Sequence, residues 1–487
     1  MEYEAVIGLE VHAELLTRSK MFCSCPVVDA TQSRPNIAVC PVCSGMPGVL
    51  PVINEQAVGY AIKVALALDC QIATTSIFAR KNYFYPDLPK GYQISQYEYP
   101  LAEYGRLRIR TGQGDRDIHI RRVHMEEDTG KLTHVPANSN GAAYSLVDLN
   151  RAGVSLLEIV SDPDMHTLEE VRAYAQGLRA ILRYLGVNSG DMEKGVIRFE
   201  ANVSVRPVGC ETLGTRVEIK NLNSFRALER ASAYQIQKQI EIIEAGGSIR
   251  QETLGWDEAK GETYTQRSKE EAHDYRYFPE PDLPPLVVEQ AWIDQIAASL
   301  PELPEPKARR FQQQYGLTPA DAALLAEDKS VANFFEAVLA AAPLVSARTV
   351  SNWIVGEIFG WINQTGHSFE TLPLSPENLA ELLNLSGRDI NLNTAKIVLA
   401  EMLSSGQRAP EIIRARGLGQ ISDTDTVATL VGQVLKAHPD QLANYVAGKE
   451  TLSNWFFGQV MRSAQGQANP QVLRAELERQ LNAEKAK

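Results

Sequence analysis

Hydrophobic and polar residues alternate along four segments in the first half of the chain, and this period of two predicts β-strands. The four segments are residues 3–12, 117–127, 196–206 and 215–221. In the first segment the odd-numbered residues are mainly apolar, whereas Glu10 and His12 lie side by side on the opposite face. We therefore expect an open antiparallel sheet with one face toward a hydrophobic core and one polar face.

The polar face of this predicted sheet gathers acidic side chains from all four strands. They are Glu10, Glu126, Glu200 and Glu218, and His12 lies beside the first of them. For any single strand a solvated polar face is the simpler interpretation. Carboxylates brought close together repel one another, however, and do not all ionise without a cation. Oxygen ligands with one imidazole suit Mg²⁺ or Mn²⁺, ions that usually serve phosphoryl transfer.

Apolar residues at helical spacing predict amphipathic helices over residues 168–185 and 225–245. Thr167 and Glu170 form the capping-box pattern before the first helix, and Gly246-Gly247 ends the second. These helices are expected to form the scaffold of the sheet.

The composition changes near residue 280, where several prolines mark a boundary. Ala, Leu, Glu and Gln then dominate at helical spacing, so the second half is expected to be helical, with another break near residues 406–419. Asn469-Pro470 predicts the start of a last helix that buries Val472, Leu473 and Leu477.

Four of the six cysteines lie within 21 residues and form two close pairs, Cys23 with Cys25 and Cys40 with Cys43. This spacing predicts a structural, tetrahedral Zn²⁺ site, and the alternative is a set of buried free thiols. No secretory signal is recognised, which favours a reducing, cytoplasmic compartment and metal binding over disulfides. No apolar run is long enough to predict a membrane span. The net charge of −12 argues against a basic nucleic-acid surface along the whole chain.

Two segments combine cations, aromatic rings and turn prolines, at residues 81–92 and 274–282. Such segments can stack and clamp a nucleotide or the end of a nucleic acid, although an aromatic turn that seals a core edge fits equally well. A Gly-x-x-x-x-Gly-Lys-Ser/Thr loop, a Gly-x-Ser-x-Gly elbow and an amidase or glutaminase pattern are not found in the sequence. A phosphoryl-transfer site would therefore have to be built on the sheet.

At these residues the sequence resembles the family of aspartyl/glutamyl-tRNA amidotransferase B subunits. The resemblance extends over essentially the whole chain. Matching stretches are Val6-Ile-Gly-Leu-Glu-Val-His12, Arg80-Lys-Asn-Tyr-Phe-Tyr-Pro86, Gly91-Tyr-Gln-Ile-Ser-Gln96, His124-Met-Glu-Glu-Asp128, Glu158-Ile-Val-Ser161, Ala201-Asn-Val-Ser204, Glu218-Ile-Lys-Asn-Leu-Asn-Ser-Phe225, Asp274-Tyr-Arg-Tyr-Phe-Pro-Glu-Pro-Asp282 and Gly458-Gln-Val-Met461.

The resemblance implies an α+β fold with three parts. A catalytic cradle domain with a glutamine-synthetase-like antiparallel sheet is expected over residues 1–293, with the zinc-binding insertion at 23–43. An all-α helical domain follows over 294–407, and a small all-α tail domain over 408–487. The tail is implied to touch tRNA, although its nine basic and eight acidic residues from 411 onward do not by themselves predict RNA binding, and a packing domain is the alternative.

The resemblance also implies ATP-dependent transamidation of misacylated glutamyl-tRNA(Gln), of aspartyl-tRNA(Asn), or of both. The side-chain carboxylate is phosphorylated, and ammonia then displaces phosphate. Ammonia is implied to come from a separate amidase (glutaminase), the A chain of the complex, and a small third chain, C, completes a heterotrimer. A non-catalytic tRNA-binding scaffold with a zinc clip and a metal hydrolase are the competing interpretations.

The residues that match the family's motifs are expected to carry these roles. For Mg²⁺ they are Glu10, His12, Glu126, Glu127, Glu200 and Glu218, and for Zn²⁺ the four cysteines. Position 200 is often Asp in the family. Lys81 and Arg198 are expected to stabilise the transferring group, although ion pairs of structural importance are the alternative. The nucleotide is expected to contact Lys81, Tyr83, Tyr85, Lys90, Tyr92 and Arg276.

Overall fold

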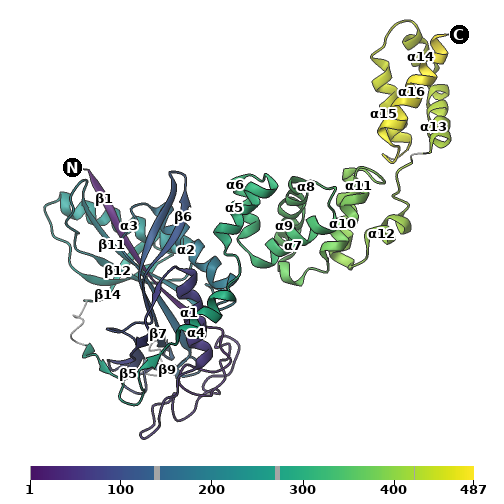
Figure 1. Ribbon diagram of the computed structural model, residues 1–487. Helices are drawn as coiled ribbons and strands as arrows, with labels where there is room; N and C mark the ends of the chain where they lie inside the picture. The colour runs from purple at the N-terminus through teal and green to yellow at the C-terminus, as the bar shows by residue number, and fades with distance from the viewer. Residues whose placement is uncertain (1, 136–142, 269–274, 422, 465, 487) are drawn as a thin grey trace. The chain divides into compact units, whose positions relative to one another are not determined.

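The structure is a computed structural model that describes residues 2–135, 143–268, 275–421, 423–464 and 466–486 (Figure 1). The chain divides into two compact units, Met1–Lys307 and Ala308–Lys487. In the second unit, buried hydrophobic side chains form two separate groups, at residues 308–412 and 427–481. The division into three domains with boundaries at 293 and 407 stays a prediction.

The first unit is built on a sheet of twelve strands. Its main path runs β14-β13-β12-β11-β1-β10-β7-β5-β4-β15, and β6 joins β2 to β7. The strands are β1 (Tyr3–Glu14), β2 (Gln71–Ile72), β4 (Ala79–Asn82), β5 (Tyr92–Ser95), β6 (Ala102–Thr111), β7 (Gly114–Glu127), β10 (Ser155–Ser161), β11 (Ile197–Pro207), β12 (Val217–Leu222), β13 (Glu252–Asp257), β14 (Glu262–Ser268) and β15 (Phe278–Pro279). Two further pairs form small sheets, β3 (Thr75–Ser76) with β16 (Leu286–Val287) and β8 (Lys131–Val135) with β9 (Tyr144–Asp148).

Antiparallel pairing dominates this sheet, which confirms the expected α+β class. The exception is the parallel pair β12–β13, which is joined by the helix α3 (Phe225–Glu244). A parallel pair requires such a crossover because the chain has to return to the same end of the sheet. All four predicted strands are present, as β1, β7, β11 and β12.

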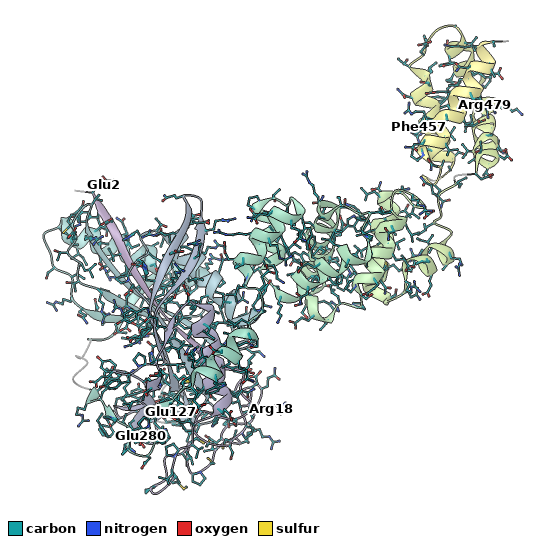
Figure 2. All side chains as sticks on the ribbon, in the orientation of Figure 1. Glu2, Arg18, Glu127, Glu280, Phe457 and Arg479 are labelled. Carbon is teal, nitrogen blue, oxygen red and sulfur yellow. The ribbon has the colours of Figure 1, made fainter. Side chains whose placement is uncertain are left out.

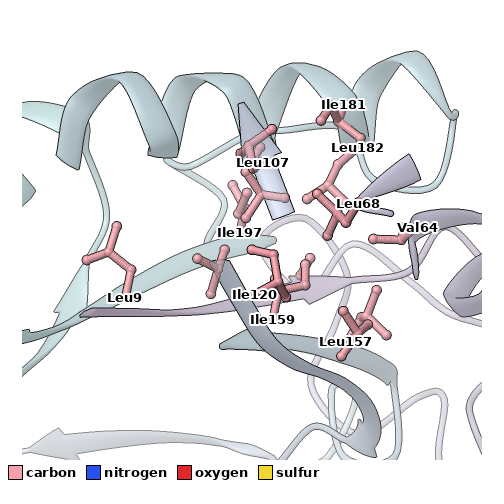
Figure 3. Close-up of a cluster of buried hydrophobic side chains, with 14 of the residues drawn as sticks. Leu9, Val64, Leu68, Leu107, Ile120, Leu157, Ile159, Ile181, Leu182 and Ile197 are labelled. Atoms are coloured by element: carbon pink, nitrogen blue, oxygen red, sulfur yellow. The ribbon is translucent and has the colours of Figure 1, made fainter. Parts of the chain in front are cut away.

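One face of the sheet packs against helices and forms the hydrophobic core. The odd-numbered residues of β1 from Ala5 to Ala13 are buried, as the period of two predicts. The helix α2 (Leu168–Tyr184) packs against β6 and α3, while α1 (Glu55–Ala67) contacts β7. Figure 3 shows Leu9 and Ile159 on the sheet and Leu182 on the helix above the sheet, and all three belong to the same cluster. The opposite face of β1 is therefore left for polar side chains.

The remaining elements are helical, as expected. They are α4 (Gln290–Ala298), α5 (Pro304–Tyr315), α6 (Pro319–Ala326), α7 (Lys329–Ala341), α8 (Ala347–Asn352), the π-helix η2 (Trp353–Ile358), α9 (Phe359–Thr365), the 3₁₀ turn η3 (Phe369–Thr371), α10 (Pro376–Leu385), α11 (Leu392–Ser405), α12 (Ala409–Arg416), α13 (Thr424–Ala437), α14 (Pro439–Val446), α15 (Leu452–Ser463) and α16 (Pro470–Lys485). Among the described residues, no helix combines the length and apolarity that crossing a membrane requires.

The last helix begins where the sequence predicts. The Asn469 side chain accepts hydrogen bonds from the backbone N–H groups of Gln471 and Val472, and Pro470 is the first helical residue. Leu473 and Leu477 are buried in the cluster of residues 427–481, and Val472 packs at its edge.

The capping box of α2 is tied to the sheet through Glu170. The Thr167 hydroxyl accepts from the Glu170 N–H, and the Glu170 carboxylate accepts from the backbone N–H groups of His166 and Thr167. The same carboxylate forms an ion pair with Arg116 of β7. Burial opposes ionisation of Glu170, but the hydrogen bonds and Arg116 outweigh it and lower the pKa below the usual 4.5.

We expect Glu170→Gln to destabilise the protein by about 1–2 kcal/mol at pH 7, because it breaks the capping box and the ion pair. A carboxylate whose folded pKa is lowered contributes stability above its unfolded pKa and loses it as the pH falls through the folded value. The difference from wild type should therefore shrink as the pH falls below the ordinary Glu pKa of about 4.3 toward the lowered folded pKa, as measured by urea unfolding. Glu169→Gln, in the same turn but exposed, is the matched control, and an equal loss there would contradict this account.

Candidate active site

Strand register brings the polar side chains of five neighbouring strands onto one face. Glu10 of β1 lies directly opposite Glu200 of β11, and His12 lies opposite Glu158 of β10. Glu158 in turn lies opposite His124 of β7. Side chains of directly opposite residues on one face approach closely, so acidic and imidazole groups that are far apart in sequence become neighbours.

The first cluster is formed by His12, Glu126 and Glu158. His12 Nε2 lies 3.4 Å from Glu158 Oε2 and 4.0 Å from Glu126 Oε1. His124 Nε2 lies 3.2 Å from the same Glu158 oxygen, and Ser95 Oγ donates to Glu126 Oε2 at 3.2 Å. One ligand atom from each of His12, Glu126 and Glu158 falls within 4.8 Å of the others. This spacing allows a single metal ion to contact all three residues.

The second cluster is formed by Glu10, Glu200 and Glu218, with the same spacing of ligand atoms, within 4.8 Å. Lys220 Nζ lies 2.5 Å from Glu200 Oε2 and 3.2 Å from Glu218 Oε1. Asn202 Nδ2 donates to Glu10 Oε1 at 2.8 Å. Five of the six predicted magnesium ligands therefore gather on one face, in two groups of three that Glu158 completes.

Buried charge perturbs the ionisation of both clusters. Burial opposes protonation of His12, but the carboxylates of Glu158, Glu200 and Glu126 outweigh it and raise the pKa to about 9. Burial likewise opposes ionisation of Glu158, yet His124 and His12 hold its pKa well below 4.5. The pKa of Glu10 is raised, first by burial and then by its carboxylate neighbours. A cation bound between these carboxylates would relieve that repulsion.

Both clusters open into one cavity of about 610 Å³. Basic side chains on its wall include Lys81, Arg122 and Arg216. Aromatic rings close another part, where the rings of Tyr97 and Tyr277 stack with centroids 4.2 Å apart. The cavity thus combines carboxylates that suit divalent cations with cations and rings that suit a phosphorylated nucleotide.

The four paired cysteines form a separate cluster, with their Sγ atoms within 4.8 Å of one another. Cys43 Sγ lies 3.9 Å from Cys25 Sγ and 3.8 Å from Cys40 Sγ. The buried Lys20 places its ammonium 3.7 Å from Cys43 Sγ. The pKa of the Cys43 thiol is lowered to about 4, chiefly by a hydrogen bond from Cys23. A metal ion can be held here by thiolates alone.

Comparisons with known proteins agree with this arrangement. The protein-family model of the GatB/GatE catalytic domain matches residues 5–294, and the family model of the GatB domain matches residues 333–481. The aspartyl/glutamyl-tRNA(Asn/Gln) amidotransferase B subunit of Moorella thermoacetica is 51% identical over 482 residues, which cover 99% of this chain and 100% of the relative. The chain belongs to the family of these amidotransferase B subunits. The family members of Thermodesulfovibrio yellowstonii and Myxococcus xanthus are 50% and 48% identical, over 97% and 99% of this chain and 98% and 99% of their own lengths.

One predicted magnesium ligand of this B-subunit chain does not reach the cavity. The carboxylate of Glu127, labelled in Figure 2, pairs with Lys90 and accepts from the backbone N–H of Ile94 at 2.9 Å. Glu126 and Glu127 are consecutive in β7, and consecutive strand residues point to opposite faces. Glu127 therefore lies toward Cys43, beside a small cavity of about 20 Å³ that both residues line. Glu127 thus lies apart from Glu126, and its expected role as a magnesium ligand stays a prediction.

The two predicted catalytic cations occupy different environments. Lys81 lines the cavity, with its Nζ 5.1 Å from the ring centre of Tyr275. Arg198 instead donates from Nη2 to Asp128 Oδ2 at 2.9 Å and lies 3.6 Å from Glu14. Arg198 is absent from the described lining of the cavity, so its geometry favours the structural ion pair.

Of the residues expected to contact a nucleotide, only Lys81 belongs to the described cavity wall. Tyr83 packs edge-on against Tyr275, Tyr92 lies under the Arg80 guanidinium at 4.2 Å, and Lys90 is paired with Glu127. Tyr85 and Arg276 are exposed. Asp274, at the start of the second aromatic segment, lies outside the described residues. Tyr275 and Tyr277 of that segment do line the cavity.

Glu158 and Lys220 are two of the charged site residues that were not predicted from the sequence. Glu158 is the one charged residue in the otherwise apolar or hydroxyl-bearing strand β10, and a lone carboxylate in such a strand is the signal that identifies it. Lys220 shares its strand face with Glu218, but the sequence does not show which carboxylate it meets.

The opposite orientations of Glu126 and Glu127 can be tested by divalent-ion binding. We expect Glu126→Gln to weaken Mn²⁺ binding at least about tenfold, since it removes a charged ligand (about 1.4 kcal/mol for each tenfold). Glu127→Gln is the matched control and should leave the Mn²⁺ affinity within about threefold, because a neutral amide there lies on the far side of β7. Electron paramagnetic resonance of free Mn²⁺ measures both. Equal losses would mean that the strand is oriented otherwise.

Proposed function

We propose that this chain catalyses the amide-forming half of ATP-dependent transamidation. The substrates would be glutamate or aspartate attached to tRNA(Gln) or tRNA(Asn), as the names of the relatives indicate. The single observation that supports the proposal most directly is the cavity in which two carboxylate clusters face a lysine and aromatic rings. A binding scaffold has no need to concentrate buried carboxylates in one place, because that arrangement is electrostatically costly.

The donor set of the cavity fits hard divalent cations such as Mg²⁺. His12, Glu126 and Glu158 would hold one ion, and Glu10, Glu200 and Glu218 are suited to another. Asn202 donates to Glu10, and its buried Oδ1 has no hydrogen-bond partner among the described residues, so an unused acceptor oxygen lies next to the second cluster. Bound there, Mg²⁺ would supply neutralisation of the phosphate charge of ATP during phosphoryl transfer.

The reaction has to activate the side-chain carboxylate of the amino acid on the tRNA. This carboxylate resists attack by ammonia because it is negatively charged and has no good leaving group. Its attack on the terminal phosphorus of ATP forms an acyl phosphate and releases ADP; ammonia then attacks the carbonyl carbon, and phosphate leaves. Lys81, on the wall of the cavity, would stabilise negative charge on the transferring phosphoryl group. The stacked Tyr97 and Tyr277 would position a planar group such as a base.

Partner chains would supply the release of ammonia from glutamine, for which this chain has no sequence pattern. Its sequence carries no glutaminase pattern, so the ammonia would come from the amidase (glutaminase) chain of the complex. A small third chain would complete a heterotrimer in the cytoplasm. The tail formed by α13, α14, α15 and α16 is proposed to contact the tRNA body.

We expect Glu158→Gln to lower amide formation at least about 100-fold, because it removes the carboxylate that His12 and His124 share and a metal ligand with it. The assay supplies the chain, in its complex, with ammonium, ATP, Mg²⁺ and misacylated tRNA, and it measures amidated aminoacyl-tRNA. Glu193→Gln, at an exposed position away from the clusters, is the control and should keep its activity.

The same assay separates the competing functions. A tRNA-binding scaffold would bind misacylated tRNA but would form no amide with ammonium. A metal hydrolase would consume substrate without ATP. Unimpaired amide formation by Glu158→Gln would show that the reaction takes place elsewhere.

The cysteine cluster is proposed to hold a structural Zn²⁺. Tetrahedral thiolates at about 2.3 Å from zinc are about 3.8 Å apart, which agrees with the Sγ distances of 3.8 and 3.9 Å at Cys43. Four thiolates fill the coordination shell and leave no position for substrate. The ion would therefore fold the segment of residues 23–43.

We expect Cys43→Ser to lose most of the zinc, because it removes a ligand from a closed tetrahedral shell. Elemental analysis of the purified protein measures the zinc-to-protein ratio. Cys210→Ser, which lies outside the cluster, is the matched control and should retain the metal. Zinc retained by the first variant or lost by the second would contradict the assignment.

A further inference from the structure

Lys220 occupies an unusual place in the second carboxylate cluster. Phe199 of β11 pairs with Leu222, but Ala201 pairs with Ile219, so Glu200 faces two residues of β12 instead of one. The two are Lys220 and Asn221, and Asn221 has the left-handed φ of 59°. Such a β-bulge redirects the side chains of the bulged strand. It places the Lys220 ammonium between Glu200 and Glu218.

The ammonium of Lys220 contacts two of the three carboxylates that a metal ion in the second cluster would need. It contacts the Glu200 and Glu218 carboxylates at 2.5 and 3.2 Å, and these two residues belong to the set that is spaced for a single ion. An ammonium has donors and no lone pair, so it cannot share the site as a ligand. Its positive charge also repels a divalent cation.

The first cluster differs in this respect. The groups that pair with Glu126 and Glu158 are the imidazoles of His12 and His124, and an imidazole nitrogen can itself be a metal ligand. Among the described residues no ammonium is ion-paired with these two carboxylates, so a divalent ion can reach them without moving a lysine. At the second cluster the lysine side chain itself would have to move.

We propose that Lys220 is an internal counter-cation that competes with a divalent ion for Glu10, Glu200 and Glu218. The first cluster then binds its ion unaided, whereas the second binds one only when an anion draws the ammonium away. Lys220 lines the same cavity as both clusters, and its flexible four-carbon stem allows the ammonium to move. A phosphate group of the bound nucleotide is an anion of the required kind, so this step rests on the proposed function.

The experiment measures binding of Mn²⁺ alone to the full chain by electron paramagnetic resonance. We expect wild type to bind one Mn²⁺ tightly and Lys220→Met to bind a second at least about tenfold more tightly than wild type does, because a repelling charge is removed. Lys220→Arg keeps the charge and should resemble wild type. Adding Glu200→Gln to Lys220→Met should abolish the gained binding. An unchanged second affinity in Lys220→Met would overturn the proposal.

Stability provides a second measurement, because Lys220→Met leaves carboxylates without their counter-charge. The variant should melt at a lower temperature than wild type in chelator, and Mn²⁺ should raise its melting temperature more than that of wild type. If Mn²⁺ fails to stabilise the variant selectively, the proposal is wrong.

These outcomes are distinguishable from a failure of the proposed function. Wild type that binds no Mn²⁺ sensitive to Glu126→Gln would contradict the metal site of the proposed function. Wild type that binds one such ion, with no second ion gained by Lys220→Met, would contradict the role of Lys220 alone.

Discussion

Mutual repulsion among carboxylates is the constraint on which the polar face of this sheet depends. Acidic groups of Glu10, Glu126, Glu158, Glu200 and Glu218 converge on one cavity, and they stay ionised together only if positive charge stands between them. The His12 imidazole supplies it in one cluster and the Lys220 ammonium in the other. The core on the opposite face offsets the cost of this arrangement, since it holds the strands in register against the repulsion.

The alternation of side chains along strands separates the chemistry of neighbouring residues. Glu126 lies in the cavity, while Glu127 supports the segment next to the cysteine cluster through Lys90 and Ile94. A single strand thus links the cavity with the carboxylate clusters and the region next to the cysteine cluster, one on each of its faces. Rotation or slippage of β7 by one residue would exchange the two carboxylates and disrupt both regions.

Much of the fold could be predicted because local periodicity determines it. The four alternating strands, the capping box at Thr167 and the cap at Asn469 depend on neighbours in sequence, and all are present. The site was harder, because its contacts depend on register. The alternation of side chains along the strand placed Glu10 and His12 on one face. Only the pairing of the strands shows that Glu158 lies opposite His12. The β-bulge at Lys220 and Asn221 has no local signature in composition, so the partner of the lysine could not be foreseen.

The central position of β1 has a consequence for synthesis of the chain. β1 precedes both of its neighbours in the chain, since β10 and β11 begin only at Ser155 and Ile197. At roughly 5–20 residues per second, the first strand waits on the order of ten seconds before either edge is covered. During that interval Ile7, Leu9 and Val11 form an apolar strand with unpaired backbone groups, which is a template for aggregation. Binding of a chaperone to the nascent chain would protect this strand until β10 and β11 have been made and the candidate active site can form.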